Sequence, residues 1–206
     1  ARPEIGLGAK KEDNISKANA NITVNGYSGV YDGAAHGATG SATGVNEEDL
    51  SGSLDLGPSF TNVPGGTADW TFTGGQNYND DSGSVDIEIT PKAASVIPDA
   101  ASKTYGSADP ALTGTLSGFL VSDGVTADYT RTAGETVLGG PYIISATLSP
   151  EEVLSNYDII YNTAEFTIEP KEASVTPNDA SKTEGDTLTF TGTEFTASGL
   201  INADTV

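Results

Sequence analysis

The chain contains the same phrase twice, and this repetition constrains its fold more than any other feature. The stretch NYNDDSGSVDIEITPKAASV covers residues 77–96, and NYDIIYNTAEFTIEPKEASV covers residues 156–175. Both begin with Asn-Tyr, reach Pro-Lys 14 residues later and end with Ala-Ser-Val. Related phrases also begin at Lys17, Lys92 and Lys171, with spacings of 75 and 79 residues. A fixed period of this kind indicates a repeated structural unit.

The period predicts separate small domains. It is too long for a solenoid repeat and fits beads on a string, each with its own core. Domains of this size are marginal but can fold alone. The predicted organisation is an N-terminal segment that ends a preceding module, two complete β modules, and the front part of a third, incomplete module. These four parts cover residues 1–16, 17–91, 92–170 and 171–206.

The joints between the predicted modules are short. ITPKAA and IEPKEA each link the last strand of one module to the first strand of the next. Each joint carries one Pro, which fixes φ and keeps the preceding residue extended, and neither contains a Gly/Ser spacer. We therefore expect the modules to form a semi-rigid, extended rod.

Alternating apolar residues predict that each module is mainly β. In residues 85–89 (VDIEI) and 164–168 (AEFTI), apolar side chains alternate with acidic or polar ones, which places them on one face of a strand. Residues 70–73 (WTFT) and 141–148 (PYIISATL) follow the same period. Gly, Pro, Asn and Asp lie between these runs and mark turns. Only residues 149–157 (SPEEVLSNY) offer a helical turn, with the Ser as its cap.

The charge balance excludes several classes of function. The 206 residues include 29 Asp plus Glu and 9 Lys plus Arg, a formal net charge of −20. Nucleic acids and anionic membranes are therefore poor partners. No run approaches the roughly 20 apolar residues of a membrane span, so no membrane insertion is expected. No signal segment opens the chain, so we expect a mature or excised piece.

No catalytic machinery is predicted. The chain has no Cys, and its single His, His36, lies in a Gly/Ala-rich turn that is typical of the surface. Without Cys, neither a thiolate nucleophile nor a disulfide framework can form. An isopeptide staple at Lys17, Lys92 or Lys171 is a further hypothesis, although a solvated Lys at a joint is ordinary.

The candidate site is a calcium loop. Asn79, Asp80 and Asp81 place oxygen ligands on a Gly-containing loop, the donor type that calcium prefers. Residues 47–49 (EED) form a second acidic spot. Neither spot matches a known calcium-loop pattern, and a solvated turn is the alternative explanation. We expect no other cofactor.

Several motifs resemble known bacterial modules. TYGSADPALTGTLSGFLVSDG, YTRTAGETV, GPYIISATL and NYDIIYNTAEFTIEPK, which follow one another between residues 92 and 170, resemble the MBG module of the YGX type. GVYDGAAHGATGSATGV, NVPGGTADWTFTGGQNYND and VDIEITPKA, between residues 17 and 91, resemble the related YDG-type repeat. The third copy departs from the pattern, because Glu184-Gly185 replaces Tyr-Gly and its back half is absent. The resemblance implies a mostly β fold, either an immunoglobulin-like sandwich or a β-grasp-like sheet, in secreted stalks or adhesins.

We therefore expect an extracellular or cell-surface structural segment, a stalk, spacer or fibre of a large bacterial surface protein or adhesin, and no enzyme. The alternative is a ligand-binding adhesin module that holds calcium or a glycan in its loops and takes a host or matrix ligand as its partner. A concave cluster of aromatic side chains at a loop end would favour this alternative. Buried aromatic side chains would favour the spacer.

The incomplete third module predicts a partner. Its front half includes an expected strand around Leu188 and Phe190 but lacks counterparts of residues 141–148 and 156–168. Alone, it would expose apolar faces and strand edges. We expect it to pair with another copy of the chain, through a neighbour's N-terminal segment in a head-to-tail fibre. An excerpt of a longer polypeptide is the other explanation.

Overall fold

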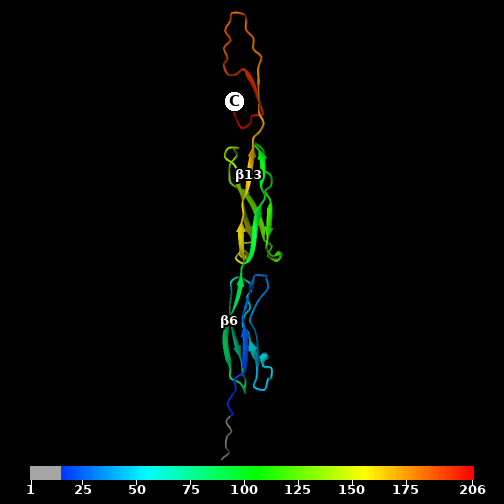
Figure 1. The fold of residues 1–206 in the computed structure, drawn as a ribbon, viewed down its shortest axis with the longest axis vertical. Helices are drawn as coiled ribbons and strands as arrows, with labels where there is room; N and C mark the ends of the chain where they lie inside the picture. Colours follow the sequence, from blue (N-terminus) through cyan, green and yellow to red (C-terminus); the bar gives the residue numbers. More distant parts are fainter. Residues whose placement is uncertain (1–14) are drawn as a thin grey trace, which may run out of the picture. The chain divides into compact units, whose positions relative to one another are not determined.

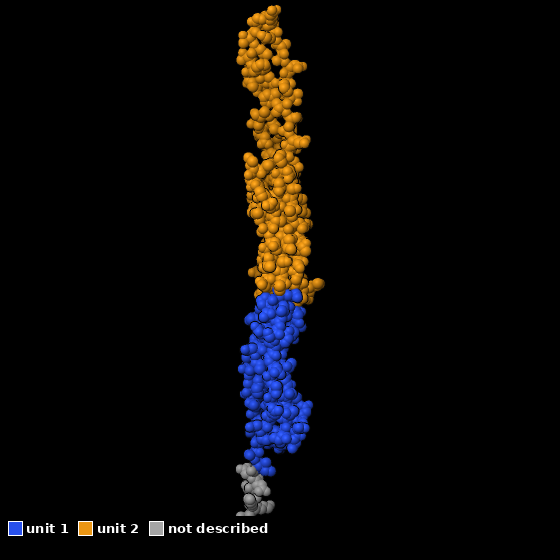
Figure 2. Space-filling model, in the orientation of Figure 1, with its two compact units in different colours: residues 1–92 blue, residues 93–206 orange. Residues whose placement is uncertain are grey.

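The computed structural model describes residues 15–206, so nearly all of the predicted N-terminal segment lies outside the described part. The chain divides into two compact units, residues 1–92 and residues 93–206 (Figure 2). Strands account for 45% of the residues and helices for 5%, which confirms that the protein is mainly β. The unit boundary at Lys92 lies beside the predicted module boundary.

Unit 1 contains one two-stranded and one four-stranded sheet. Its elements are β1 (Asn21–Asn25), β2 (Tyr27–Val30), β3 (Thr39–Thr43), the 3-10 turn η1 (Ser51–Ser53), β4 (Leu54–Asp55), β5 (Gly65–Phe72) and β6 (Asp81–Thr90). β1 pairs with β3, and the larger sheet has the order β2-β6-β5-β4; Figure 1 labels β6 of this sheet. Only β2 and β6 run parallel in that sheet, and the other neighbours are antiparallel.

The predicted alternation places the core of unit 1. Ile87 and Ile89 on β6 are 1% and 2% exposed, while the alternating acidic residues Asp86 and Glu88 face solvent. On β5, Phe72 is buried in a cluster with Ala42 and Tyr78. Gly65 begins β5 with φ +88, and a Cβ there would lie 1.9 Å from the Ile87 carbonyl oxygen. A glycine is therefore required where β5 first meets β6.

Unit 2 repeats the strand order of the larger sheet. Its elements up to residue 170 are β7 (Lys92–Pro98, which begins at the boundary), β8 (Ala101–Thr104), β9 (Gly114–Ser117), the 3-10 turn η2 (Val121–Asp123), β10 (Thr126–Arg131), β11 (Tyr142–Ser149), α1 (Glu151–Leu154), β12 (Tyr157–Tyr161) and β13 (Ala164–Glu169). One sheet has the order β8-β13-β11-β10, with β8 and β13 parallel, and a second has the order β12-β7-β9. The buried core cluster of unit 2 consists of Tyr142, Ile144, Phe166 and Ile168.

The helical turn is confirmed as α1, but its predicted cap is wrong. Ser149 ends β11, where it pairs with Thr126, so it cannot adopt the cap position. Pro150 is the capping residue, and no side chain caps the turn. Because α1 has only four residues, the described part contains no helix that could cover a sheet.

Residues 171–206 form an antiparallel hairpin with a long irregular connection. β14 (Ser174–Pro177) pairs with β15 (Phe195–Ser198). The prediction of a strand around Leu188 and Phe190 is wrong. These side chains are 39% and 66% exposed in the connection, where no described strand pairs with them.

Candidate functional site: an ionic cluster and a repeated tyrosine contact

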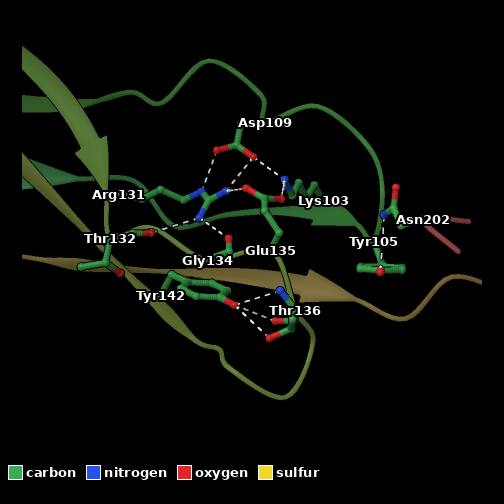
Figure 3. Close-up of polar contacts among 10 residues, drawn as sticks. All are labelled: Lys103, Tyr105, Asp109, Arg131, Thr132, Gly134, Glu135, Thr136, Tyr142 and Asn202. Carbon is green, nitrogen blue, oxygen red and sulfur yellow. Dashed lines mark hydrogen bonds and ion pairs between the residues drawn. The ribbon is translucent and has the colours of Figure 1, made fainter. Parts of the chain in front are cut away.

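Four charged side chains of unit 2 form a closed ionic cluster (Figure 3). The Arg131 guanidinium lies against both oxygens of Asp109, with Nε 2.6 Å from Oδ2 and Nη2 3.0 Å from Oδ1. The Lys103 ammonium lies 2.7 Å from Asp109 Oδ1 and also contacts Glu135. Arg131 Nη2 donates to Glu135 Oε1 at 2.6 Å. Two positive and two negative groups thus balance each other, and the arginine binds Asp109 in the bidentate geometry that makes such pairs strong.

The sheet explains why the two cations are buried. Lys103 lies on β8 and Arg131 ends β10, and their side chains are 5% and 8% exposed. The guanidinium carbon of Arg131 lies 4.6 Å from the centre of the Phe166 ring and 5.3 Å from that of Tyr142. The positive charge therefore packs against two aromatic rings of the core, a favourable cation–π arrangement.

The loop after β10 is attached to the sheet by the same arginine and by one tyrosine. Arg131 Nη1 donates to the carbonyl oxygens of Thr132 and Gly134 at 3.0 and 2.7 Å. The Tyr142 hydroxyl accepts from the Thr136 N–H at 3.0 Å and donates to the Thr136 carbonyl oxygen at 2.8 Å. The ionic cluster thus orders a loop as well as two strands.

The electrostatics keep all four groups charged near neutral pH. Arg131 foremost, and Lys103 next, lower the pKa of Asp109 to about 2. Hydrogen bonds to Asp109 and then to Glu135 raise the pKa of Lys103. The pKa of Glu135 is lowered, mainly by Lys103. A lysine held as an ammonium is not a nucleophile, so the four residues fit a structural role as stabilising ion pairs rather than a reactive site.

A tyrosine contact joins a loop to a strand in unit 2. The Tyr157 hydroxyl, at the start of β12, accepts from the Leu120 N–H at 3.0 Å and donates to Asp123 Oδ2 at 2.5 Å. The Tyr157 side chain is buried, and its ring lies 4.9 Å from that of Phe119. We call this combination of a backbone N–H, a tyrosine hydroxyl and a carboxylate the tyrosine contact.

Unit 1 contains the same tyrosine contact. The Tyr78 hydroxyl accepts from the Val45 N–H at 3.0 Å and donates to Glu48. The hydrogen bond with Tyr78 is the main reason that the pKa of Glu48 is lowered, and it raises the pKa of Tyr78. Tyr78 and Tyr157 are the second residues of the two repeated phrases. The repetition of Asn-Tyr therefore has a structural cause in both units.

The predicted calcium residues lie at the start of β6. Asp80 Oδ1 accepts from the Gly74 N–H and Asp81 Oδ1 from the Ser82 N–H, both at 2.8 Å. Asn79 Nδ2 donates to a neighbouring Asn side chain at 2.7 Å, and all three predicted residues are exposed. Within residues 15–206, no group of three His, Cys, Asp or Glu side chains is arranged for a metal ion. These oxygens serve the turn, and calcium binding there stays a prediction.

His36 is more buried than its sequence context predicts. Its side chain is 18% exposed, because its ring stacks on Tyr27 with centres 3.9 Å apart. Nε2 lies 2.9 Å from Asp32 Oδ1. Of the lysines considered for an isopeptide bond, Lys17 and Lys171 are exposed and Lys92 is half-buried. An isopeptide bond at these positions stays a prediction.

The sequence contained signals for the features that pattern reasoning missed. The four residues of the ionic cluster lie within the motifs SKTYGSADP and YTRTAGETV, and Arg131 is the only arginine of the described part. An isolated arginine in a strand of an acidic chain indicates a specific partner, but the sequence alone does not identify which of many carboxylates it meets.

Helices are too short to cross a bilayer anywhere in residues 15–206.

Comparison with known protein families identifies part of the chain. No curated protein is a match for it. Residues 94–167, which cover most of β7 and continue into β13, match the family model described as the MBG domain of the YGX type. This family occurs in bacterial surface proteins and is typical of secreted or surface proteins. The predicted MBG resemblance over residues 92–170 is thus confirmed, while the YDG-type resemblance of residues 17–91 stays a prediction. Residues 94–167 are therefore an MBG domain of the YGX type.

Proposed function

We propose that the chain is a structural repeat segment, a stalk or spacer, of a bacterial surface protein and that it is not an enzyme. The MBG domain at residues 94–167 carries this proposal, because its family occurs in bacterial surface proteins. The larger sheet of unit 1 has the same strand order as that of the MBG domain. This shared order supports a chain built from successive copies of one kind of β module, displayed outside the cell.

The distribution of aromatic side chains supports a spacer rather than a glycan-binding module. Glycan sites present several aromatic faces together in a hollow of the surface. Of the 15 aromatic residues, only Tyr161 and Phe190 are exposed, at 53% and 66%. Tyr161 ends β12, whereas Phe190 lies in the connection between β14 and β15. Binding to a host or matrix ligand stays a prediction.

The joint between the units supports a semi-rigid link. β6 ends at Thr90 and β7 begins at Lys92, so Pro91 is the only residue between the two strands. A single Pro with fixed φ leaves fewer conformations than a Gly/Ser spacer would. An extended rod of modules follows as part of the proposal.

The spacer function can be tested by measuring height above a surface. The chain is attached to a solid support at its N-terminus and carries a fluorophore at its C-terminus. Deletion of residues 94–167 should lower the height of the fluorophore above the support by the length of one module and should leave the rest of the chain folded. An unchanged height would contradict the spacer, and retention on a glycan array would favour the ligand-binding alternative.

A further inference from the structure

Residues 171–206 reproduce the front half of the MBG domain. The hairpins β7–β9 and β14–β15 have the same register; the matching pairs are Ser95–Ser117 and Val96–Leu116 in the first, and Ser174–Ser198 and Val175–Ala197 in the second. Each hairpin ends in a glycine with positive φ, +84 at Gly118 and +85 at Gly199. At either glycine, a Cβ would lie within 2.5 Å of a backbone carbonyl oxygen of the partner strand's segment. In each hairpin this oxygen belongs to the residue two positions before the first paired residue, Ser95 or Ser174. The two segments therefore share backbone geometry as well as sequence.

One edge of this hairpin lacks the strand that its counterpart has. In the MBG domain, β7 lies between β9 and β12, and the backbone N–H and Nδ2 of Asn162 donate to the Val96 carbonyl oxygen at 3.0 and 3.1 Å. Among residues 15–206, β14 pairs with β15 alone. Val175 is 50% exposed, whereas Val96, in a domain that also has a second, four-stranded sheet, is fully buried. An open strand edge of this kind is a template for a further strand.

The hairpin also contains two of the three groups of the tyrosine contact. In the MBG domain these groups are the Leu120 N–H and the Asp123 carboxylate, in a turn where the Asp123 N–H donates to the Leu120 carbonyl oxygen at 3.2 Å. The same turn recurs after β15, where the Asp204 N–H donates to the Ile201 carbonyl oxygen at 2.9 Å. Within the described residues, neither the Ile201 N–H nor the Asp204 carboxylate has a hydrogen-bond partner.

We propose that residues 171–206 bind an extended strand that opens with Asn-Tyr and continues with alternating apolar residues. The strand pairs with β14, and its tyrosine hydroxyl donates to Asp204 and accepts from the Ile201 N–H. Unit 2 holds such a strand, β12, in the tyrosine contact, and in unit 1 Tyr78 makes the same contact from an isolated β-bridge. The contact common to both units identifies the chemistry of the partner's tyrosine. Residues 1–16 contain no tyrosine, so the partner proposed here differs from the neighbour's N-terminal segment expected from the sequence, and pairing through that segment stays a prediction.

A synthetic peptide with the sequence of residues 155–170 tests the site in the full chain. Its binding is measured by fluorescence anisotropy, and amide NMR shifts locate it. The expected result is saturable binding that shifts the amides around Val175 and Ile201. A peptide in which the Asn-Tyr tyrosine is replaced by Phe should bind about tenfold more weakly, because a hydrogen bond to a charged group is lost.

Variants of the chain show whether the tyrosine meets Asp204. Asp204→Asn should weaken binding of the tyrosine peptide by a similar factor. It should leave binding of the phenylalanine peptide unchanged, because the change in the chain and the change in the peptide remove the same interaction. Asp179→Asn is the matched control, an exposed acid of the same segment, and should bind both peptides as the native chain does.

Four results would overturn the proposal. The first is that the peptide shows no saturable binding. The second is that the loss of affinity from the Tyr-to-Phe change in the peptide multiplies with the loss from Asp204→Asn. The third is that the amide shifts lie at residues 95–98, which would mean that the peptide replaces β12 in the MBG domain. Self-association of the chain, measured by sedimentation without peptide and not reversed by it, would assign the edge to a second copy and would also overturn the proposal.

Discussion

At the scale of single residues, the tyrosine contact explains why the chain repeats Asn-Tyr. In each unit one hydroxyl satisfies a backbone N–H and a carboxylate at the same time, beside a buried ring. A buried phenol needs partners for its hydroxyl, and a charged acceptor strengthens the bond. Sequence reasoning identified the repeated tyrosine but not its partners, because Glu48 and Asp123 lie 30 and 34 residues away in a chain with many acids.

Removal of one hydroxyl should destabilise unit 2. Tyr157→Phe leaves the Leu120 N–H and the Asp123 carboxylate without the tyrosine hydroxyl, so we expect the free energy of unfolding to fall by about 1–2 kcal/mol. Urea denaturation followed by circular dichroism measures this change. Tyr161→Phe is the control, since Tyr161 is 53% exposed, and it should have almost no effect. An equal loss in the two variants would contradict the role of the contact.

The ionic cluster predicts a dependence of stability on pH. The pKa of Asp109 is about 2 in the folded protein and 3.8 ordinarily. Because the folded value is the lower one, Asp109 stabilises the fold fully above about pH 4, and this contribution is lost as the pH falls toward 2. The difference in unfolding free energy between the native chain and Asp109→Asn should therefore shrink from pH 5 to pH 2.

The control for this measurement is Asp128→Asn, which changes an exposed acid of β10 outside the cluster. Its difference from the native chain should stay nearly constant over the same range. Comparison of differences is essential, because protonation of many other acids also reduces charge repulsion in a chain with a net charge of −20. A constant difference for Asp109→Asn would contradict the assignment.

Calcium at Asp80 and Asp81 remains testable at the same scale. A bound ion would stabilise the folded state by mass action. Under that hypothesis, the melting temperature in calcium should exceed that in a sodium salt of matched ionic strength, and Asp80→Asn should abolish the excess. Equal melting temperatures in the two salts would leave only charge screening, which agrees with the hydrogen bonds of these side chains to the turn.

At the scale of elements, the period of two predicted the long strands well. β5, β6, β11 and β13 were all expected from alternation, and their apolar residues form the cores of the units. Pairing and register could not be predicted, because period-two patterns fix the face of a strand but not its neighbour. The strand expected at Leu188 and Phe190 failed for a related reason. Propensity alone does not make a strand where the segment pairs with no neighbouring strand.

A core substitution on β13 should affect unit 2 alone. Phe166 is fully buried and lies under the Arg131 guanidinium, so Phe166→Ala should cost about 3–5 kcal/mol. In calorimetry, the transition of unit 2 should move to lower temperature while that of unit 1 stays in place. Thr167→Ala, which changes the exposed neighbour on the same strand, should shift neither transition by more than a small amount. A shift of both transitions would show that the units do not unfold independently.

At the scale of the whole molecule, the prediction of a modular surface protein came from composition and from repeated motifs. The MBG domain was recognised from separated motifs in a fixed order, and its matched bounds, residues 94–167, lie within the predicted module. Net charge directed attention away from nucleic acids, which stays a prediction, and a negative charge by itself specifies solubility rather than a fold. The partner strand proposed for residues 171–206 became visible only when the two hairpins could be compared in register.

The central claim is that the chain is a spacer of successive β units, and small-angle X-ray scattering of the full chain tests it most directly. A single compact globule of this length would have a radius of gyration of about 17 Å. The spacer predicts a value well above this, with a maximum dimension that matches units arranged end to end and falls when residues 94–167 are deleted. A radius of gyration near that of a compact globule would contradict the account.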